Sequence, residues 1–240
     1  MPAVVAHRGA SAAAPENTLA AMRRAAEMGA RWAECDVRLS ADGVAVVLHD
    51  GTLDRTTDGR GALAAHTAAE LARLDAGSWR DAAFAGEPVP TLAALLEEGR
   101  RLGLGLNVEI KADDVAAARA TAVVAAPLLA AWPGEVIVSS FHDAALQALR
   151  RVAPGLRRGL LCHRRAGAAE IARARQVEAV SLHADRRAFD RGTAAGLAAA
   201  ALWPVAYTVN EADEALTLWR LGVRTLITDR PDALLPLAPA

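Results

Sequence analysis

Leu106-Asn107-Val108-Glu109-Ile110-Lys111 is a short segment in which apolar and polar residues alternate, and it contains the only lysine of the chain. A period of two is typical of a β-strand, and it places Asn107, Glu109 and Lys111 on one face. Seven further short apolar segments occur along the 240 residues. The eight predicted strands cover residues 3–8, 32–38, 106–111, 136–140, 158–162, 179–183, 205–209 and 225–228.

Stretches rich in alanine, leucine and arginine separate most of these strands, and their length suits a helix. Clear examples are residues 18–28, 91–102, 115–131 and 212–221. Strands that alternate with helices favour βαβ units and a parallel sheet. Eight such units in a chain of this length predict an α/β fold, a TIM (β/α)₈ barrel. Because no internal repeat or linker divides the chain, we expect one domain over residues 1–240.

The segment after the second predicted strand departs from this alternation. A turn signal at residues 40–43 is followed by another apolar stretch that ends at His49. So short a connection cannot form a parallel crossover, so residues 37–48 are predicted to form an antiparallel hairpin arm. Folding about the turn brings His49 back beside Glu34. Residues 51–90, rich in Gly, Thr, Asp and Pro, are predicted to form a small insertion.

Composition excludes several classes of protein. The formal net charge is −1 without a long charged run, which argues against a nucleic-acid-binding protein. No apolar stretch is long enough to span a membrane, so we expect no stable membrane insertion. The N-terminus resembles no signal peptide, and Cys35 and Cys162 are predicted to be buried thiols, so we expect a cytoplasmic protein. The sequence leaves the oligomeric state open, and a homo-oligomer is one of the alternatives.

The carboxyl ends of the predicted strands, where TIM barrels carry their chemistry, are unusually polar in this chain. Glu34 and Asp36 lie two residues apart on the second strand, and the hairpin arm delivers His49 to the same end. The polar residues expected to meet there are His7, Arg8, Glu34, Asp36, His49, Glu109, Lys111 and Tyr207.

The carboxylates among these residues would repel one another, and a bound cation would relieve that repulsion. Oxygen ligands suit Mg²⁺ or Ca²⁺, and the histidine and cysteine set that zinc prefers is missing. Arg8 and Lys111 add positive charge, so the site suits an anion, most simply a phosphate. His7 and His49 then supply a general acid and a general base near neutral pH. The residues therefore predict metal-assisted cleavage of a phosphoester.

The chain resembles the glycerophosphodiester phosphodiesterase family in segments that follow the family's order from residue 3 to about residue 232. These segments are His7-Arg8-Gly9, Pro15-Glu16-Asn17-Thr18, Glu34-Cys35-Asp36-Val37, Leu48-His49-Asp50, Leu53-Asp54-Arg55-Thr56-Thr57, Glu109-Ile110-Lys111, Ser139-Ser140-Phe141, Tyr207-Thr208-Val209-Asn210 and Thr228-Asp229. Asp75-Ala76-Gly77-Ser78-Trp79 looks most like the cytosolic bacterial members that serve glycerol-phosphate uptake.

The resemblance implies an enzyme, a phosphoric diester hydrolase, that converts a small-molecule glycerophosphodiester to glycerol 3-phosphate and an alcohol. It implies one divalent metal ion, Mg²⁺ or Ca²⁺ with Mn²⁺ as an alternative. The implied roles are metal binding by Glu34, Asp36 and Glu109, acid–base catalysis by His7 and His49, and phosphate binding by Arg8 and Lys111. As a hypothesis, the reaction passes through a cyclic phosphate.

Four further residues are candidates for substrate binding with alternatives left open. Glu16 lies beside Arg8 or beside the metal. Phe141 packs on the substrate glycerol or closes the top of the barrel, and His183 lines the pocket or belongs to the core or the rim. Tyr207 stands where many relatives have tryptophan. The remaining histidines are expected on the surface or at helix caps: His66, His142 and His163.

Two alternative functions compete with this hypothesis. A lysophospholipase D-like enzyme or a phosphoinositide phosphodiesterase on the same scaffold should leave an exposed apolar rim, whereas residues 51–90 look polar. A non-catalytic barrel that only binds a phosphodiester is expected to lose a histidine or a metal ligand, and all five of those residues are present.

Overall fold

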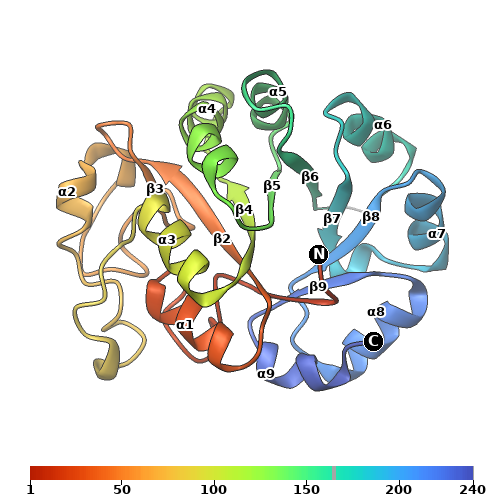
Figure 1. Ribbon diagram of the computed structural model, residues 1–240, viewed down its shortest axis with the longest axis horizontal. Coiled ribbons are helices and arrows are strands. Elements are labelled where there is room, and N and C mark those ends of the chain that lie inside the picture. Colours follow the sequence, from red (N-terminus) through yellow and green to blue (C-terminus); the bar gives the residue numbers. More distant parts are fainter. Residues whose placement is uncertain (164–165, 240) are drawn as a thin grey trace.

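The computed structural model, which describes residues 1–163 and 166–239, has a closed ring of parallel strands at its centre (Figure 1). Neighbours pair in the order β1-β9-β8-β7-β6-β5-β4-β2, and β1 pairs with β2 to close the ring. The ring strands are β1 (Val4–Ala6), β2 (Trp32–Leu39), β4 (Gly105–Ile110), β5 (Val136–Ser140), β6 (Arg157–Cys162), β7 (Ser181–Asp185), β8 (Trp203–Tyr207) and β9 (Thr225–Thr228). The predicted TIM barrel is confirmed.

Helices surround the ring and cover its outer face (Figure 1). They are α1 (Leu19–Glu27), α3 (Leu92–Leu102), α4 (Val115–Ala131), α5 (Asp143–Val152), α6 (Ala168–Gln176), α7 (Arg191–Ala199), α8 (Ala212–Leu221) and α9 (Pro231–Leu234). Side-chain caps fix several starts: the Thr91 hydroxyl accepts a hydrogen bond from the Ala94 N–H, and the Asp114 carboxylate accepts one from Ala117. Among the described helices, none has the length and apolar character needed to cross a bilayer.

The predicted hairpin arm is present. Strand β3 (Ala45–Val47) pairs antiparallel with the end of β2, with Val37 opposite Val47, and it lies outside the ring. The Ser40 backbone and side chain close the turn through hydrogen bonds with Val44. As expected from this pairing, His49 returns to the carboxyl end of β2.

Residues 51–90 pack beside the arm around a small hydrophobic cluster of their own. They include α2 (Ala68–Leu71) and the short helices η1 (Leu63–Ala65) and η2 (Ala82–Phe84). The cluster joins the arm to the insertion because β3 contributes to it; its members are Val46, Leu48, Leu53, Leu63, Leu71, Ala76 and Val89. Since the Val47 N–H also donates to Pro90, the arm is held on both sides.

Strand ends differ from the predicted ones where the backbone turns sharply. Strand β1 stops at Ala6 because Arg8 and Gly9 adopt left-handed backbone angles, with φ of 55° and 79°. A Cβ atom on Gly9 would lie 2.5 Å from the Ala21 backbone, so only glycine fits there. Strand β8 starts at Trp203 although Pro204 has no N–H, because the Pro204 carbonyl still accepts from Arg224.

Candidate active site

A cavity of about 230 Å³ opens at the carboxyl ends of the ring strands, where most of the predicted site residues meet. The predicted residues that line it are His7, Arg8, Glu34, His49, Glu109, Lys111, Phe141 and Tyr207. Asp36 lies beside Glu34 and Glu109. Glu16 and His183 are not part of the lining.

Three buried carboxylates form an acidic cluster at this cavity. Glu34 and Asp36 come from β2 and Glu109 comes from the neighbouring β4, where Asp36 is in register with Glu109. One oxygen of each carboxylate lies within 4.8 Å of the others. Glu34 Oε1 is buried and has no hydrogen-bond partner among the described residues. Such a converging set of oxygens is the kind of ligand set that Mg²⁺ and Ca²⁺ accept.

The electrostatics of the cluster also favour a cation. Burial raises the pKa of Glu34 well above its usual value, and the charges of Asp36 and Glu109 raise it further. Burial and then Asp36 raise the pKa of Glu109 to about 7, although Lys111 opposes them. For Asp36, burial is outweighed by Arg8 and Lys111, which hold its pKa below the usual range. The cluster thus contains more negative charge than its surroundings neutralise.

Asp36 is fixed in place by a reciprocal pair of hydrogen bonds with Asn17. The Asn17 side-chain amide donates to Asp36 Oδ2 at 2.8 Å, and the Asp36 backbone N–H donates to Asn17 Oδ1 at 3.1 Å. Asn17 itself is buried and adopts a φ of 60°, a conformation that asparagine tolerates better than most residues. The loop after β1 therefore positions a carboxylate of β2.

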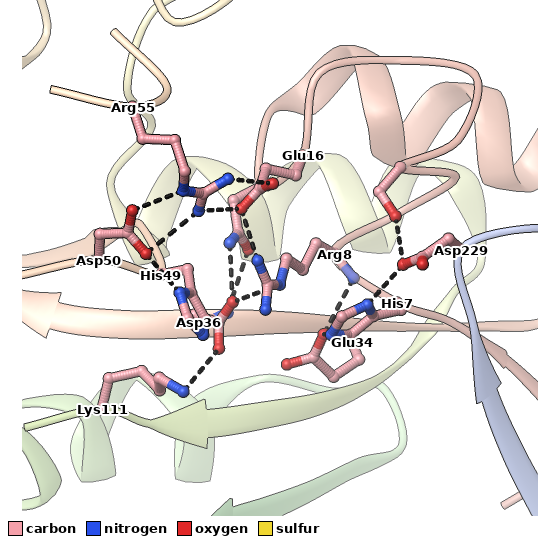
Figure 2. Close-up of polar contacts among 12 residues, drawn as sticks. His7, Arg8, Glu16, Glu34, Asp36, His49, Asp50, Arg55, Lys111 and Asp229 are labelled. Carbon is pink, nitrogen blue, oxygen red and sulfur yellow. Dashed lines mark hydrogen bonds and ion pairs between the residues drawn. The ribbon is translucent and has the colours of Figure 1, made fainter. Parts of the chain in front are cut away.

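Two cations flank the acidic cluster, and Figure 2 shows both of them beside Asp36. The Arg8 guanidinium lies 3.1 Å from Asp36, and the Arg8 backbone N–H donates to Glu34 at 2.9 Å. Lys111 Nζ lies 2.9 Å from Glu109 and 3.8 Å from Asp36. Both cations line the cavity, so they present positive charge to whatever occupies it.

His7 and His49 are each paired with a carboxylate through the Nδ1 atom (Figure 2). His7 Nδ1 lies 2.6 Å from Asp229, and His49 Nδ1 lies 2.6 Å from Asp50. A carboxylate at Nδ1 favours the tautomer that has its proton there, which leaves Nε2 for proton transfer. Burial lowers the pKa of His49, and Arg8 adds to this, while Asp36 acts in the opposite direction.

Arg55 connects the insertion to the active site (Figure 2). Its guanidinium donates to both carboxylate oxygens of Asp50, at 2.6 and 3.1 Å, and to both of Glu16, at 2.8 Å each. Glu16 in turn accepts from Arg8 at 2.6 Å. Of the two positions predicted for Glu16, the structure shows the one beside Arg8. Arg55 therefore supports both the carboxylate behind His49 and the one behind Arg8.

Aromatic side chains form another part of the cavity wall. The rings of Phe141 and His163 stack with centroids 4.1 Å apart, and Tyr207 meets Phe141 edge-on at 6.2 Å. The Tyr207 hydroxyl donates to the Cys162 carbonyl at 2.9 Å, which fixes the ring, and burial raises its pKa. His163 was expected only on the surface or at a cap; it is exposed but also lines the cavity.

Comparisons with known proteins agree with this geometry. The model of the glycerophosphoryl diester phosphodiesterase family matches residues 7–233. The chain belongs to this family. The predicted resemblance to the family and the predicted enzyme class, a phosphoric diester hydrolase, are thereby confirmed. The closer likeness to the cytosolic members of glycerol-phosphate uptake stays a prediction.

Members of the glycerophosphoryl diester phosphodiesterase family from several bacteria resemble the chain over nearly its whole length. A glycerophosphodiester phosphodiesterase of Caldanaerobacter subterraneus is 36% identical over 98% of this chain and 96% of the relative. A phosphodiesterase of Oleispira antarctica, solved in complex with the product sn-glycerol-3-phosphate, is 34% identical with a TM-score of 0.94. That comparison covers 98% of this chain and 96% of the other.

The geometry of this family member provides the elements of phosphodiester cleavage. Two histidines with oriented tautomers, an acidic cluster and two cations all border one cavity. Asp229 and Arg55, which orient these groups, were not predicted as site residues. Both lie in segments that carried the resemblance, but nothing in their local sequence indicated which side chains they bind.

His183 is fully buried in the barrel interior and does not line the cavity. Its Nε2 atom lies 2.8 Å from Ser181 Oγ, and Nδ1 has no hydrogen-bond partner among the described residues. Of the two interpretations of His183, substrate contact and core residue, the position favours the core residue. Because burial disfavours the charged ring, the pKa of His183 is lowered to about 3.

We expect His183 to make the fold sensitive to acid. Between about pH 6.5 and pH 3 the unfolded chain binds a proton that folded His183 does not, so stability falls as the pH falls. The slope from this residue is about 1.4 kcal/mol per pH unit. The measurement is urea unfolding of wild type and His183→Gln at several pH values. Equal slopes for the two proteins between pH 6 and pH 4 would contradict this assignment.

Proposed function

We propose that the protein hydrolyses glycerophosphodiesters to glycerol 3-phosphate and an alcohol, with one divalent cation. The observation that carries the proposal is the pairing of His7 with Asp229 and of His49 with Asp50 at the same cavity as the acidic cluster. The Oleispira antarctica relative, solved with sn-glycerol-3-phosphate, supports this substrate class.

Glu34, Asp36 and Glu109 would hold the cation. The unpartnered buried oxygen of Glu34 and the raised pKa of Glu34 and Glu109 support a positive ligand there. Oxygen ligands suit Mg²⁺ or Ca²⁺, with Mn²⁺ as the alternative. When bound, such an ion withdraws charge from a phosphate and makes a nearby hydroxyl more acidic.

The two histidines then transfer the protons. One histidine removes the proton of the glycerol 2-hydroxyl, whose oxygen attacks phosphorus, while the other protonates the alcohol oxygen as its bond to phosphorus breaks. This step yields a cyclic glycerol phosphate and the free alcohol. In the second step the roles reverse: a water loses a proton and attacks phosphorus, and the 2-oxygen leaves with a proton.

The other cavity residues bind and orient the substrate. Arg8 and Lys111 stabilise the negative charge that builds on the phosphoryl oxygens. Glu16 holds the Arg8 guanidinium in place. Phe141 offers a flat apolar surface to the carbon backbone of the glycerol, and Tyr207 packs edge-on against that surface.

The test measures glycerol 3-phosphate release from glycerophosphocholine and from its analogue with hydrogen in place of the 2-hydroxyl. We expect release that EDTA abolishes, and no turnover of the analogue, because the attacking oxygen is missing. Turnover of the analogue at a normal rate would exclude the cyclic route in favour of direct attack by water. Cleavage of lysophospholipids instead of glycerophosphodiesters would move the assignment to a lysophospholipase D-like enzyme.

The cytoplasmic location stays a prediction from the sequence, and the oligomeric state stays open, with a homo-oligomer as one alternative. The single domain over residues 1–240 is likewise part of the proposal.

A further inference from the structure

A second cavity, of about 400 Å³, adjoins the first and shares His7 and Arg8 with it. Its other walls include side chains that have no part in the proposed reaction. Trp79 and Arg80 come from the insertion, and Arg230 follows β9. All three of these side chains are exposed.

A phosphodiester has two alcohol groups on one phosphorus, so a site that cleaves it must accommodate an arm on each side of the phosphate. His7 and Arg8 lie where the two cavities meet. The first cavity, with Phe141 and Tyr207, offers apolar surface that suits the glycerol arm. The second cavity then receives the other arm, which ends in the leaving alcohol.

The carboxylates of the second cavity already accept hydrogen bonds from their neighbours. Glu16 pairs with two arginines, and Asp229 accepts hydrogen bonds from a histidine, a serine and an asparagine. Burial would raise the pKa of Asp229, but these bonds, led by the one to His7, hold it below its usual range. The oxygens of both carboxylates are thus occupied by donors of the protein, and neither carboxylate is left free to pair with a cationic head group.

The positive charge of the second cavity, in contrast, is not neutralised. The Arg80 guanidinium donates to the Ala12 carbonyl and has no carboxylate partner among the described residues. The Arg230 guanidinium makes no hydrogen bond or ion pair within the described part of the chain. Two unpaired guanidiniums at the edge of one cavity attract an anion, and arginine is well suited to bind phosphate or carboxylate.

We propose that the second cavity binds the leaving alcohol, and that Arg80 and Arg230 select alcohols that carry an anionic group, a phosphate or a carboxylate. This inference rests on the proposed phosphodiesterase function. It also assigns the roles of the histidines in the first step. Because His7 borders the second cavity and His49 does not, His7 protonates the leaving alcohol and His49 removes the proton of the 2-hydroxyl.

The test compares kcat/KM for two matched pairs of substrates. Glycerophosphoinositol 4-phosphate and glycerophosphoinositol differ only in a phosphate, whereas glycerophosphoserine and glycerophosphoethanolamine differ only in a carboxylate. For wild type we expect the anionic member of at least one pair to be favoured by about tenfold or more, as for a charge-assisted hydrogen bond. The pair that shows the preference identifies the anionic group.

Variants of the two arginines test the origin of that preference. We expect Arg80→Gln and Arg230→Gln each to lower kcat/KM for the anionic substrate by about tenfold and to change it for glycerophosphoinositol by less than about twofold. Arg119→Gln is the matched control, because it removes the same charge from an exposed position on α4 outside both cavities.

The outcomes separate the inference from the proposed function. Cleavage of glycerophosphoinositol with no preference for either anionic substrate would overturn the inference and leave the function intact. The inference is also overturned, with the function intact, if Arg80→Gln and Arg230→Gln lower kcat/KM by the same factor for all four substrates. If wild type cleaves none of the four, the proposed function fails and the inference fails with it.

Discussion

His49→Ala is expected to lower kcat for glycerophosphocholine by about 10²–10⁴-fold, because the reaction loses a proton acceptor held at a fixed distance from the substrate. His7→Ala should cause a loss of similar size through the missing proton donor. His66→Ala is the matched control, since His66 lies in the insertion, outside both cavities, and its ring hydrogen-bonds to the Ala62 carbonyl. The measurement is the steady-state rate of glycerol 3-phosphate release at saturating cation.

A substrate whose leaving group needs no proton should distinguish the two histidines. With glycerophospho-p-nitrophenol the leaving phenolate is stable, so the variant that lacks the general acid keeps most of its rate of p-nitrophenolate release in the first turnover. We expect His7→Ala to keep this rate and His49→Ala to lose it. The reverse pattern would exchange the two roles, and a loss below about tenfold for both variants with the natural substrate would remove the acid–base assignment.

Addition of Mg²⁺ or Ca²⁺ to the cation-free protein is expected to raise its melting temperature. A ligand at ~100 times its Kd stabilises the folded state by about 2.7 kcal/mol. For a chain of this size that corresponds to a rise of about 5–10 °C. The physical reason is the mutual repulsion of Glu34, Asp36 and Glu109, which a cation replaces with attraction. Differential scanning calorimetry with and without EDTA measures the change.

Glu34→Gln tests whether this response comes from the acidic cluster. The substitution keeps the shape of the side chain and removes a buried charge, so the cation-free variant should melt above cation-free wild type. The variant should also lose most of the cation response and its activity. Glu27→Gln, at an exposed position of α1, is the matched control. A cation response that survives Glu34→Gln unchanged would place the ion elsewhere.

The ring of strands was predictable because each strand has a local pattern. Segments such as residues 136–140 and 225–228 are buried by helices outside the ring and by side chains inside it, so each is a short and mainly apolar run. The hairpin arm was predictable from the length of the connection between its two strands. A turn of four residues is too short to link two parallel strands, so the strands must be antiparallel. The meeting of His7, Glu34 and Glu109 then follows from the common direction of the strands.

Other features depend on contacts that no local pattern records. The small cluster that holds the insertion joins Val46 to Val89, and it forms only when distant segments come together. An alternating pattern predicts that His183 points into the barrel. It does not predict how far along the barrel axis the residue lies, and this position decides whether His183 lines the cavity or is buried in the interior. The partners of Arg55 and Asp229 could not be predicted from the sequence either, because charged side chains in loops can point in many directions.

The hydrogen bond between His7 and Asp229 joins residues that are 222 positions apart in the chain. His7 can meet its partner only after the strands that lie between them in the chain have been made. The pairing of β1 with β9 that brings them together also closes the ring. Contacts of such long range form late in folding because of the entropy cost of closing the loop. Full orientation of His7 therefore coincides with completion of the barrel, and an incomplete chain cannot achieve it.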